Sequence, residues 1–178
     1  MARIKKYINV FLELNISFMV LSCLISIIML GLSIDSIIAI IKYIFRFMIF
    51  TIIYISIDYL STRKLPQEAI NLHQEREIQI KGDYENVFEQ CLHIMEKWKS
   101  IKSIKQIKEQ MMISALTKMT IYSNAEEITM QFDISNKQLI KIHIKSQPVG
   151  RHALMDFGKN YRNVEWIKGK IESSSFEN

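Results

Sequence analysis

The sequence predicts an N-terminal two-helix transmembrane hairpin followed by a two-layer α+β domain. Two observations indicate this fold class. Residues 1–60 hold two long apolar runs joined by a short link, Ser33 to Ser36. Residues 72–173 are rich in charge, and alternating strand patterns lie there between two stretches with helical periodicity. The predicted order is β-α-β-β-β-β-α, an antiparallel sheet with two helices packed on one face.

The hairpin is predicted to contain helices over about residues 8–32 and 36–60. Glu13 is the only ionisable residue between Val10 and Ile34. The run from Leu14 to Leu32 is long enough to cross a hydrocarbon core of about 30 Å at about 1.5 Å per residue. A cleaved signal peptide is the competing interpretation, but the run is too long and no small-residue cleavage site follows it.

Basic residues that flank the two runs predict the orientation of the hairpin. They are Arg3, Lys5, Lys6, Arg63 and Lys64. The connecting link carries only the acidic Asp35, so the positive-inside rule places both termini in the cytoplasm. We therefore expect a multi-pass protein of the cell membrane.

Lys42 and Arg46 interrupt the second run one helical turn apart, where charge is costly. One interpretation is that their side chains snorkel toward the outer headgroups, which Lys42 reaches more easily than Arg46. The other is that they bind a second membrane protein, or another copy of this chain, that supplies an acid or carbonyl oxygens. Glu13 is not that acid within one hairpin, because it falls opposite the cytoplasmic end of the second helix.

The second part is divided into a linker at residues 61–71, a cytosolic domain at 72–173 and a tail at 174–178. Pro66 ends any continuation of the preceding helix. The domain begins with a strand at Glu77–Lys81, after which Gly82 marks a turn and Asp83 is the expected N-cap of a helix. This helix runs to about Lys99, and its apolar stripe consists of Val87, Cys91, Ile94, Met95 and Trp98.

Four strands and a helix are predicted to complete the domain. The strands are expected at residues 101–107, 111–121, 127–132 and 139–146, and the helix at about 156–171. The last strand is the clearest, because Ile140, Ile142 and Ile144 alternate with polar residues. One face of the sheet is therefore expected to be buried and the other to be wet.

Charge and cysteine content exclude several classes of protein. The net charge from Ser61 onward is 18 Lys or Arg minus 15 Asp or Glu, or +3. Such a weak excess, without a recognisable motif, argues against nucleic-acid binding. Cys23 and Cys91 are the only cysteines, one in an apolar run and one in a predicted helix, so a disulfide framework is excluded.

No catalytic, metal or cofactor site is predicted. The triplet Asp156-Phe157-Gly158 matches one that kinases use to hold magnesium, but no glycine-rich loop or catalytic-loop motif accompanies it. Glu89, His93 and Glu96 share a helix face at a spacing that metal sites use. We interpret them as the solvated face opposite the apolar stripe. Cys91, on that stripe, is expected to be a core residue rather than a reactive thiol.

A run of lysines around the first strand after the helix has two interpretations. The residues are Lys97, Lys99, Lys102, Lys105 and Lys108. They are typical of a solvated sheet edge that discourages pairing with other strands. They also suit a surface near a bilayer, where each contributes about 1 kcal/mol of attraction to anionic headgroups.

The stretch from Ser146 to Ile171 resembles the end of a bacterial family of small domains of unknown function. In that family the last strand closes on Ser and is followed by Asp, Gly, Asn and a helix. The matching residues are Ser146, Gly150, Asp156, Gly158, Asn160 and Arg162. The segment between Ser146 and Asp156 is longer than in the family and lacks its serine and arginine repeat. The resemblance implies a fold and no mechanism. From the residues themselves, we expect Asp156 to cap the last helix, Gly158 to allow close approach to the sheet, and Asn160 and Arg162 to tie the preceding loop by hydrogen bonds, with ligand binding as the alternative.

These features predict a non-enzymatic accessory or scaffold protein of a bacterial cytoplasmic membrane, which contacts a membrane-protein partner or itself. The alternative is a ligand-binding module that holds a small apolar or anionic molecule between sheet and helices. A cavity lined by Met111, Met119 and Met130 would favour the alternative, and a filled core the first hypothesis.

Overall fold

The computed structural model describes the whole chain except residues 1, 32, 121–123, 137–138, 151–152 and 175–178. The chain forms two compact units, Met1–Lys64 and Leu65–Asn178.

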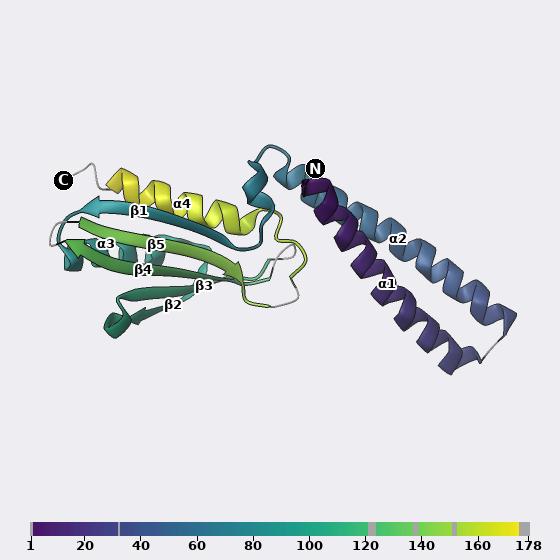
Figure 1. The fold of residues 1–178 in the computed structure, drawn as a ribbon. Coiled ribbons are helices and arrows are strands. Elements are labelled where there is room, and N and C mark those ends of the chain that lie inside the picture. Colours follow the sequence, from purple (N-terminus) through teal and green to yellow (C-terminus); the bar gives the residue numbers. More distant parts are fainter. Residues whose placement is uncertain (1, 32, 121–123, 137–138, 151–152, 175–178) are drawn as a thin grey trace. The chain divides into compact units, whose positions relative to one another are not determined.

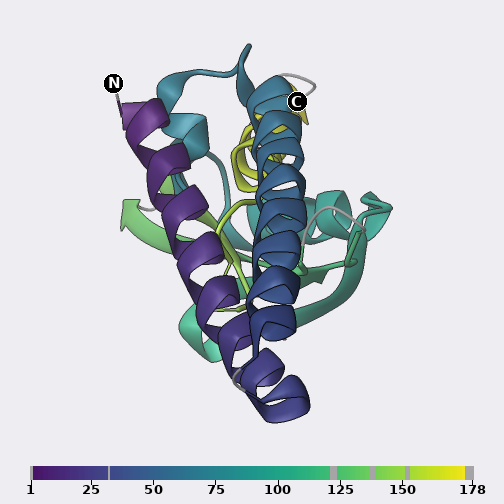
Figure 2. The ribbon, with the colours of Figure 1, turned by 90° about the vertical axis from the view of Figure 1, so that its right-hand side faces the viewer.

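The first unit is a pair of antiparallel helices, α1 (Ala2–Leu30) and α2 (Ile34–Thr62). Figure 2 shows them side by side. α1 starts before its predicted range and ends at Leu30, and α2 extends two residues beyond both of its predicted ends, because the polar ends contain no helix-breaking residue. Gly31, with a φ of +68°, ends α1, and a reciprocal capping box between Ser33 and Ser36 starts α2.

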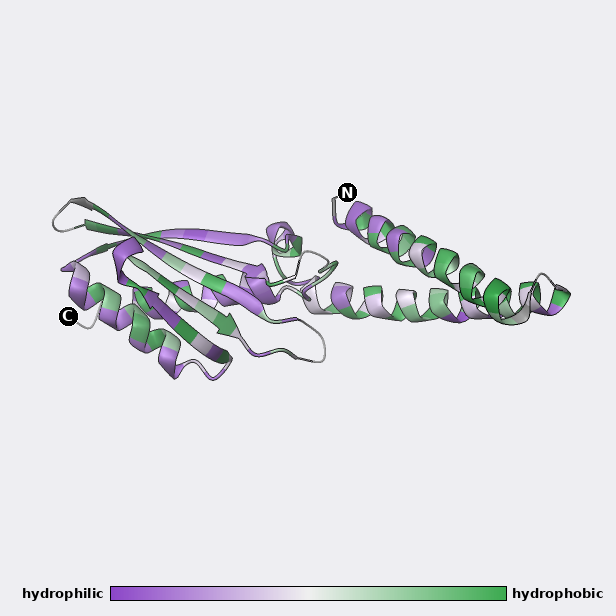
Figure 3. Cartoon of the chain, turned by 90° about the horizontal axis from the view of Figure 1, so that it is seen from below, coloured by the Kyte–Doolittle hydropathy of each residue, from purple (hydrophilic) through white to green (hydrophobic). Residues whose placement is uncertain are grey.

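Aromatic contacts set the register of the hairpin. Phe18 stacks on Phe47 with ring centroids 3.9 Å apart, and nearer the chain's start Tyr7 packs edge-on against Tyr59. Hydrophobic residues predominate along the hairpin, as the green stretches of its helices show (Figure 3). Among the described residues, all the exposed large hydrophobic side chains except Met119, Ile134 and Val149 lie on this hairpin. By length and composition, both helices are able to cross a membrane.

The second unit is an α+β domain with an antiparallel sheet, which confirms the predicted class. Its strands are β1 (Gln74–Lys81), β2 (Ile101–Ile107), β3 (Met112–Thr117), β4 (Glu126–Asn136) and β5 (Leu139–Pro148). Its helices are α3 (Tyr84–Lys97) and α4 (Lys159–Ser174), with short 3-10 turns η1 (Gln67–Ile70) and η2 (Lys108–Gln110). The strands lie in the order β1-β5-β4-β3-β2 (Figure 1).

The core lies between the sheet and both helices. Ile142 is fully buried on β5 and pairs with Ile78 on β1 and Phe132 on β4. Met95 of α3 and Ile167 of α4 are equally buried and join the same cluster. The opposite face carries cross-strand ion pairs such as Lys141–Glu77 at 2.9 Å. One face is therefore dry and the other is polar.

Several boundaries differ from the predicted ones. The predicted linker contains η1, because Ala69 and Ile70 bury their side chains and so join the second unit. The last helix begins at Lys159 and not near residue 156, because Phe157 and Gly158 adopt positive φ values of 54° and 71°. β3 ends at Thr117, and part of the remaining predicted strand lies outside the described residues. Of the predicted tail at 174–178, Ser174 is the last residue of α4, and residues 175–178 lie outside the described residues.

The weak sequence pattern of β2 has a structural cause. The pairing of β2 with β3 shifts register between Ile101 and Ser103. A bulge of this kind adds a residue to one strand, so inward-facing residues are no longer separated by two. Ile101 and Ile104, three residues apart across this shift, pair with the buried Thr117 and Ala115 of β3, whereas Ile107 pairs with the half-buried Met112.

Candidate functional site

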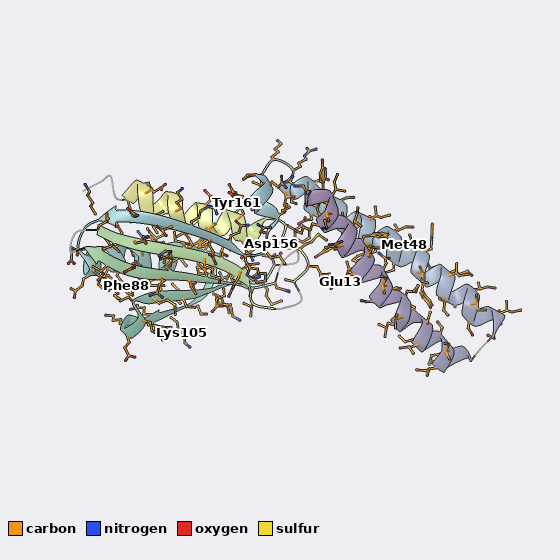
Figure 4. The ribbon with its side chains drawn as sticks, in the orientation of Figure 1. Glu13, Met48, Phe88, Lys105, Asp156 and Tyr161 are labelled. Carbon is orange, nitrogen blue, oxygen red and sulfur yellow. The ribbon has the colours of Figure 1, made fainter. Side chains whose placement is uncertain are left out.

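Lys42 and Arg46 are exposed on α2 and point away from α1. α2 meets α1 through residues such as Phe47 and Thr51. At about 100° per residue, Lys42 and Arg46 lie roughly 100° to 180° around the helix from these two contacts. Among the described residues, the structure gives neither of them an ion pair within the hairpin. Glu13 is exposed on α1 (Figure 4).

A buried polar cluster near the ends of the hairpin was missed from the sequence. The Tyr7 hydroxyl donates a hydrogen bond of 2.8 Å to Asp58 Oδ2, and the Thr62 hydroxyl donates one to the Asp58 carbonyl. Asp58 is fully buried, and its Oδ1 has no hydrogen-bond partner among the described residues. The signal was the spacing of Thr51, Asp58 and Thr62, which places three polar residues on one helical face.

The five lysines of the predicted lipid-facing surface lie along one edge of the sheet. β2 is an edge strand, and it carries Lys102 and Lys105, of which Lys105 is labelled in Figure 4. Lys97 ends α3, Lys99 follows it, and Lys108 starts η2. All five side chains are exposed. We call this set the lysine edge.

The residues of the terminal motif converge where β5 ends and α4 begins. The Ser146 hydroxyl donates a hydrogen bond of 2.6 Å to Asn160 Oδ1 and accepts one of 3.1 Å from Asn163. The Asn160 side-chain amide donates to Asp156 Oδ2 at 2.8 Å. All four residues are buried, so these hydrogen bonds satisfy groups that water does not reach.

Asp156 also binds the backbone at the start of α4. Its two carboxylate oxygens accept hydrogen bonds from the Gly158 and Asn160 backbone amides, at 3.1 and 2.8 Å. Arg162 donates to the Phe157 carbonyl at 2.6 Å. The carboxylate thus satisfies backbone donors at a helix start, which a negative charge suits.

A buried ion pair adjoins this motif and was also missed. Lys159 at the start of α4 pairs with Glu126 at the start of β4, whose side chain is 2% exposed. Thr117 donates a hydrogen bond of 2.6 Å to the same carboxylate. The Lys159 ammonium also reaches the carbonyls of Lys118 and Asn124. The strand pattern held the signal, because Glu126 shares its face with buried Ile128 and Met130.

These hydrogen bonds and this ion pair hold loops and strand ends together. Among the described residues, no three His, Cys, Asp or Glu side chains gather as metal ligands. Glu89, His93 and Glu96 are all exposed on α3. Burial raises the pKa of Cys91 to about 12, so its thiol stays protonated near neutral pH.

No protein-family model and no curated protein matches the chain. Among solved structures, it is similar to a conserved protein from Geobacillus kaustophilus, with 12% identity, a TM-score of 0.33, and coverage of 60% of this chain and 96% of that one. It is also similar to the Aha1 dimer from Colwellia psychrerythraea, with 14% identity, a TM-score of 0.33, and coverage of 59% and 94%. Similarities at such TM-scores carry no argument about this chain.

Proposed function

We propose that the chain is a non-enzymatic accessory protein of a bacterial cytoplasmic membrane, anchored by its hairpin and carrying a cytoplasmic interaction domain. The outward surface of the hairpin is the observation that carries this proposal. Side chains such as Ile28, 78% exposed, and Phe45, 64% exposed, point outward along both helices. Each large apolar side chain left in water forfeits on the order of 1 kcal/mol of burial energy. A bilayer removes that penalty for the whole hairpin at once.

Backbone hydrogen bonding also suits the membrane. α1 and α2 each run for 29 residues without a break, so their amides are satisfied within the helices, as a lipid environment requires. The basic residues that flank the hairpin favour an orientation with both termini in the cytoplasm. The second unit then lies at the inner leaflet, whose anionic headgroups suit the lysine edge.

The position of Arg46 supports the proposal of a partner protein inside the membrane. It faces outward from the hairpin with no ion pair among the described residues. An arginine at such depth is stabilised by an acid or by carbonyl oxygens on a neighbouring protein or on a second copy of the chain. Lys42 lies one turn nearer to the link and reaches the outer headgroups by snorkelling.

The alternative, a ligand held between sheet and helices, has weaker support. Met130 is 1% exposed and packed in the core, whereas Met119 is 71% exposed. Met111 and Met119 lie beyond opposite ends of β3. The three methionines therefore do not surround one cavity, and Met130 belongs to the buried cluster between sheet and helices.

Membrane extraction and thiol labelling test the anchor. The chain should stay with membranes through an alkaline carbonate wash, and residues 65–178 expressed alone should not. With Cys23 replaced by Ser, a cysteine at Ser33 should react with an impermeant thiol reagent in intact cells, and one at Ser174 only after lysis. Release by carbonate would overturn the anchor, and the reversed labelling would overturn the orientation.

A further inference from the structure

The two edges of the sheet differ in their ability to accept another strand. β2 shifts register between Ile101 and Ser103, and it exposes Lys102 and Lys105. Bulges and lysines are the features that prevent edge pairing. β1 pairs with β5 in unbroken register from end to end and contains no proline. β1 is therefore the edge left open to a further strand.

Only the second half of β1 is available. At its start, the Gln74 side chain donates to the Glu68 carbonyl at 2.7 Å. Arg76 pairs with the Glu68 carboxylate at 2.9 Å and with Glu165 of α4 at 2.5 Å. These contacts hold η1 and α4 against the first half of the strand.

A groove of about 640 Å³ borders the second half of β1. It is lined by Glu77–Lys81 on the strand and by Lys168 and Glu172 on α4. The open stretch has five residues with Gln79 at its centre. A second strand that pairs antiparallel with this stretch would therefore be centred opposite Gln79.

The open stretch is complementary to itself in this register. If Gln79 faces Gln79 of a second copy, Glu77 of each chain faces Lys81 of the other, and Ile78 faces Ile80. The two-fold axis repeats each favourable pair. Glu77 and Lys81 are both exposed, and Lys81 has no ion pair with a described residue of its own chain. Opposite charges in facing positions each stabilise a sheet by up to about 1 kcal/mol.

We propose that the chain forms a two-fold dimer by antiparallel pairing of β1 with β1 of a second copy, centred on Gln79. The two five-stranded sheets then continue into one another. The interface lies entirely in the second unit, so it does not depend on the membrane proposal.

Cysteine pairing on the full-length chain in mild detergent tests this register. With Cys23 replaced by Ser, Gln79→Cys should form a disulfide-linked dimer rapidly under mild oxidation, because directly facing Cα atoms lie about 4.5–5.5 Å apart. Glu75→Cys is the matched control on the same strand. Its two copies would be about 26 Å apart in this register and should not link. Native Cys91 is buried and does not interfere.

A charge variant tests what drives the pairing. In the Gln79→Cys background, Lys81→Glu places like charges opposite each other twice and should slow linking roughly tenfold at low salt. The difference should shrink in 1 M salt, where charges are screened. Equal linking rates at Gln79 and Glu75, or a monomeric mass before oxidation, would overturn the proposal. In a dimer held by the hairpin alone, cysteines at positions 79 and 75 would link at equal rates. A difference between the two rates therefore distinguishes a β1 interface from a hairpin interface.

Discussion

The indole rings of Trp98 and Trp166 stack with centroids 4.3 Å apart and planes 20° from parallel. Trp98 follows the last turn of α3 and Trp166 lies in the middle of α4. This stack joins the two helices on their shared side of the sheet, so both indoles should report one unfolding transition.

Removing one ring should weaken the domain. Trp166→Ala is expected to lower the free energy of unfolding by roughly 2–4 kcal/mol, somewhat less than for a fully buried ring. Urea denaturation followed by near-ultraviolet circular dichroism measures this change. Trp166→Phe keeps an aromatic partner for Trp98 and should cost less. Two separate transitions in the wild type would contradict a shared helix layer.

The buried pair of Lys159 and Glu126 should be sensitive to the loss of one partner. Lys159→Met leaves a buried carboxylate without its cation and is expected to cost about 3–5 kcal/mol of stability. Glu126→Gln combined with Lys159→Met leaves no unpaired charge, so the double variant should be more stable than Lys159→Met alone. Urea unfolding measures all three proteins.

A half-buried lysine of the same helix, with a partly exposed ion pair, provides the control for that experiment. Lys168 lies 3.9 Å from Glu172 near the surface, and such pairs contribute at most about 1 kcal/mol. Lys168→Met should therefore leave the unfolding midpoint nearly unchanged. A similar small cost for Lys159→Met would show that the buried pair does not hold the strand ends.

Because Cys91 is buried, the free energy of unfolding should decrease at alkaline pH. Burial raises its pKa from 9.0 to about 12 in the folded chain. The contribution of the neutral thiol to the free energy of unfolding is therefore complete below pH 9. It is lost as the pH rises toward 12, because the thiol of the unfolded chain ionises first. The loss is on the order of 4 kcal/mol at its largest. Stability measured from pH 8 to 11 should fall more steeply for the wild type than for Cys91→Ala, with Cys23 replaced by Ser in both. If the free energies of unfolding of the two proteins fell in parallel with pH, ionisation of the Cys91 thiol would not be the cause.

The sequence predicted best where a periodic pattern directly reflects burial. Ile140 and Ile142 alternate with Lys141 and His143, so a strand with one wet face followed from the spacing alone. β2 was harder, because its bulge removes the period of two. The short turn η1 was missed, since it depends on burying Ala69 and Ile70 against distant parts of the domain.

Side-chain pairs between segments that are distant in the sequence were also not predicted. Nothing in the spacing along the chain joins Glu126 to Lys159, and the fold alone brings them together. Ser146 and Asn160 were matched to one motif, but Asn163, which also binds Ser146, was not. Asp58 lies within the predicted second helix with no role assigned to it, although it is buried beside Tyr7.

Arg46 should be required for association within the membrane. α2 begins near the link, and helical side chains lean toward the start of their helix. Lys42 then lies about 12 Å from the start of α2, within reach of the outer headgroups, whereas Arg46 lies about 18 Å from it. We expect Arg46→Gln and Arg46→Lys both to lose the associated protein or the second copy, because a compact ammonium does not replace a planar guanidinium that binds through two parallel hydrogen bonds.

Co-purification in mild detergent, at equal expression and equal membrane insertion, measures this loss. Lys42→Gln, one turn away on the same helix, is the matched control and should retain every associated protein. If Arg46 only snorkels, Arg46→Lys and Arg46→Gln will leave the associated proteins unchanged, because either side chain reaches or avoids the headgroups at little cost. That result would remove the reason for a partner inside the membrane and leave the second unit as the interacting surface. Loss in Arg46→Gln alone would instead indicate that a positive charge suffices, as it does for an anionic lipid headgroup.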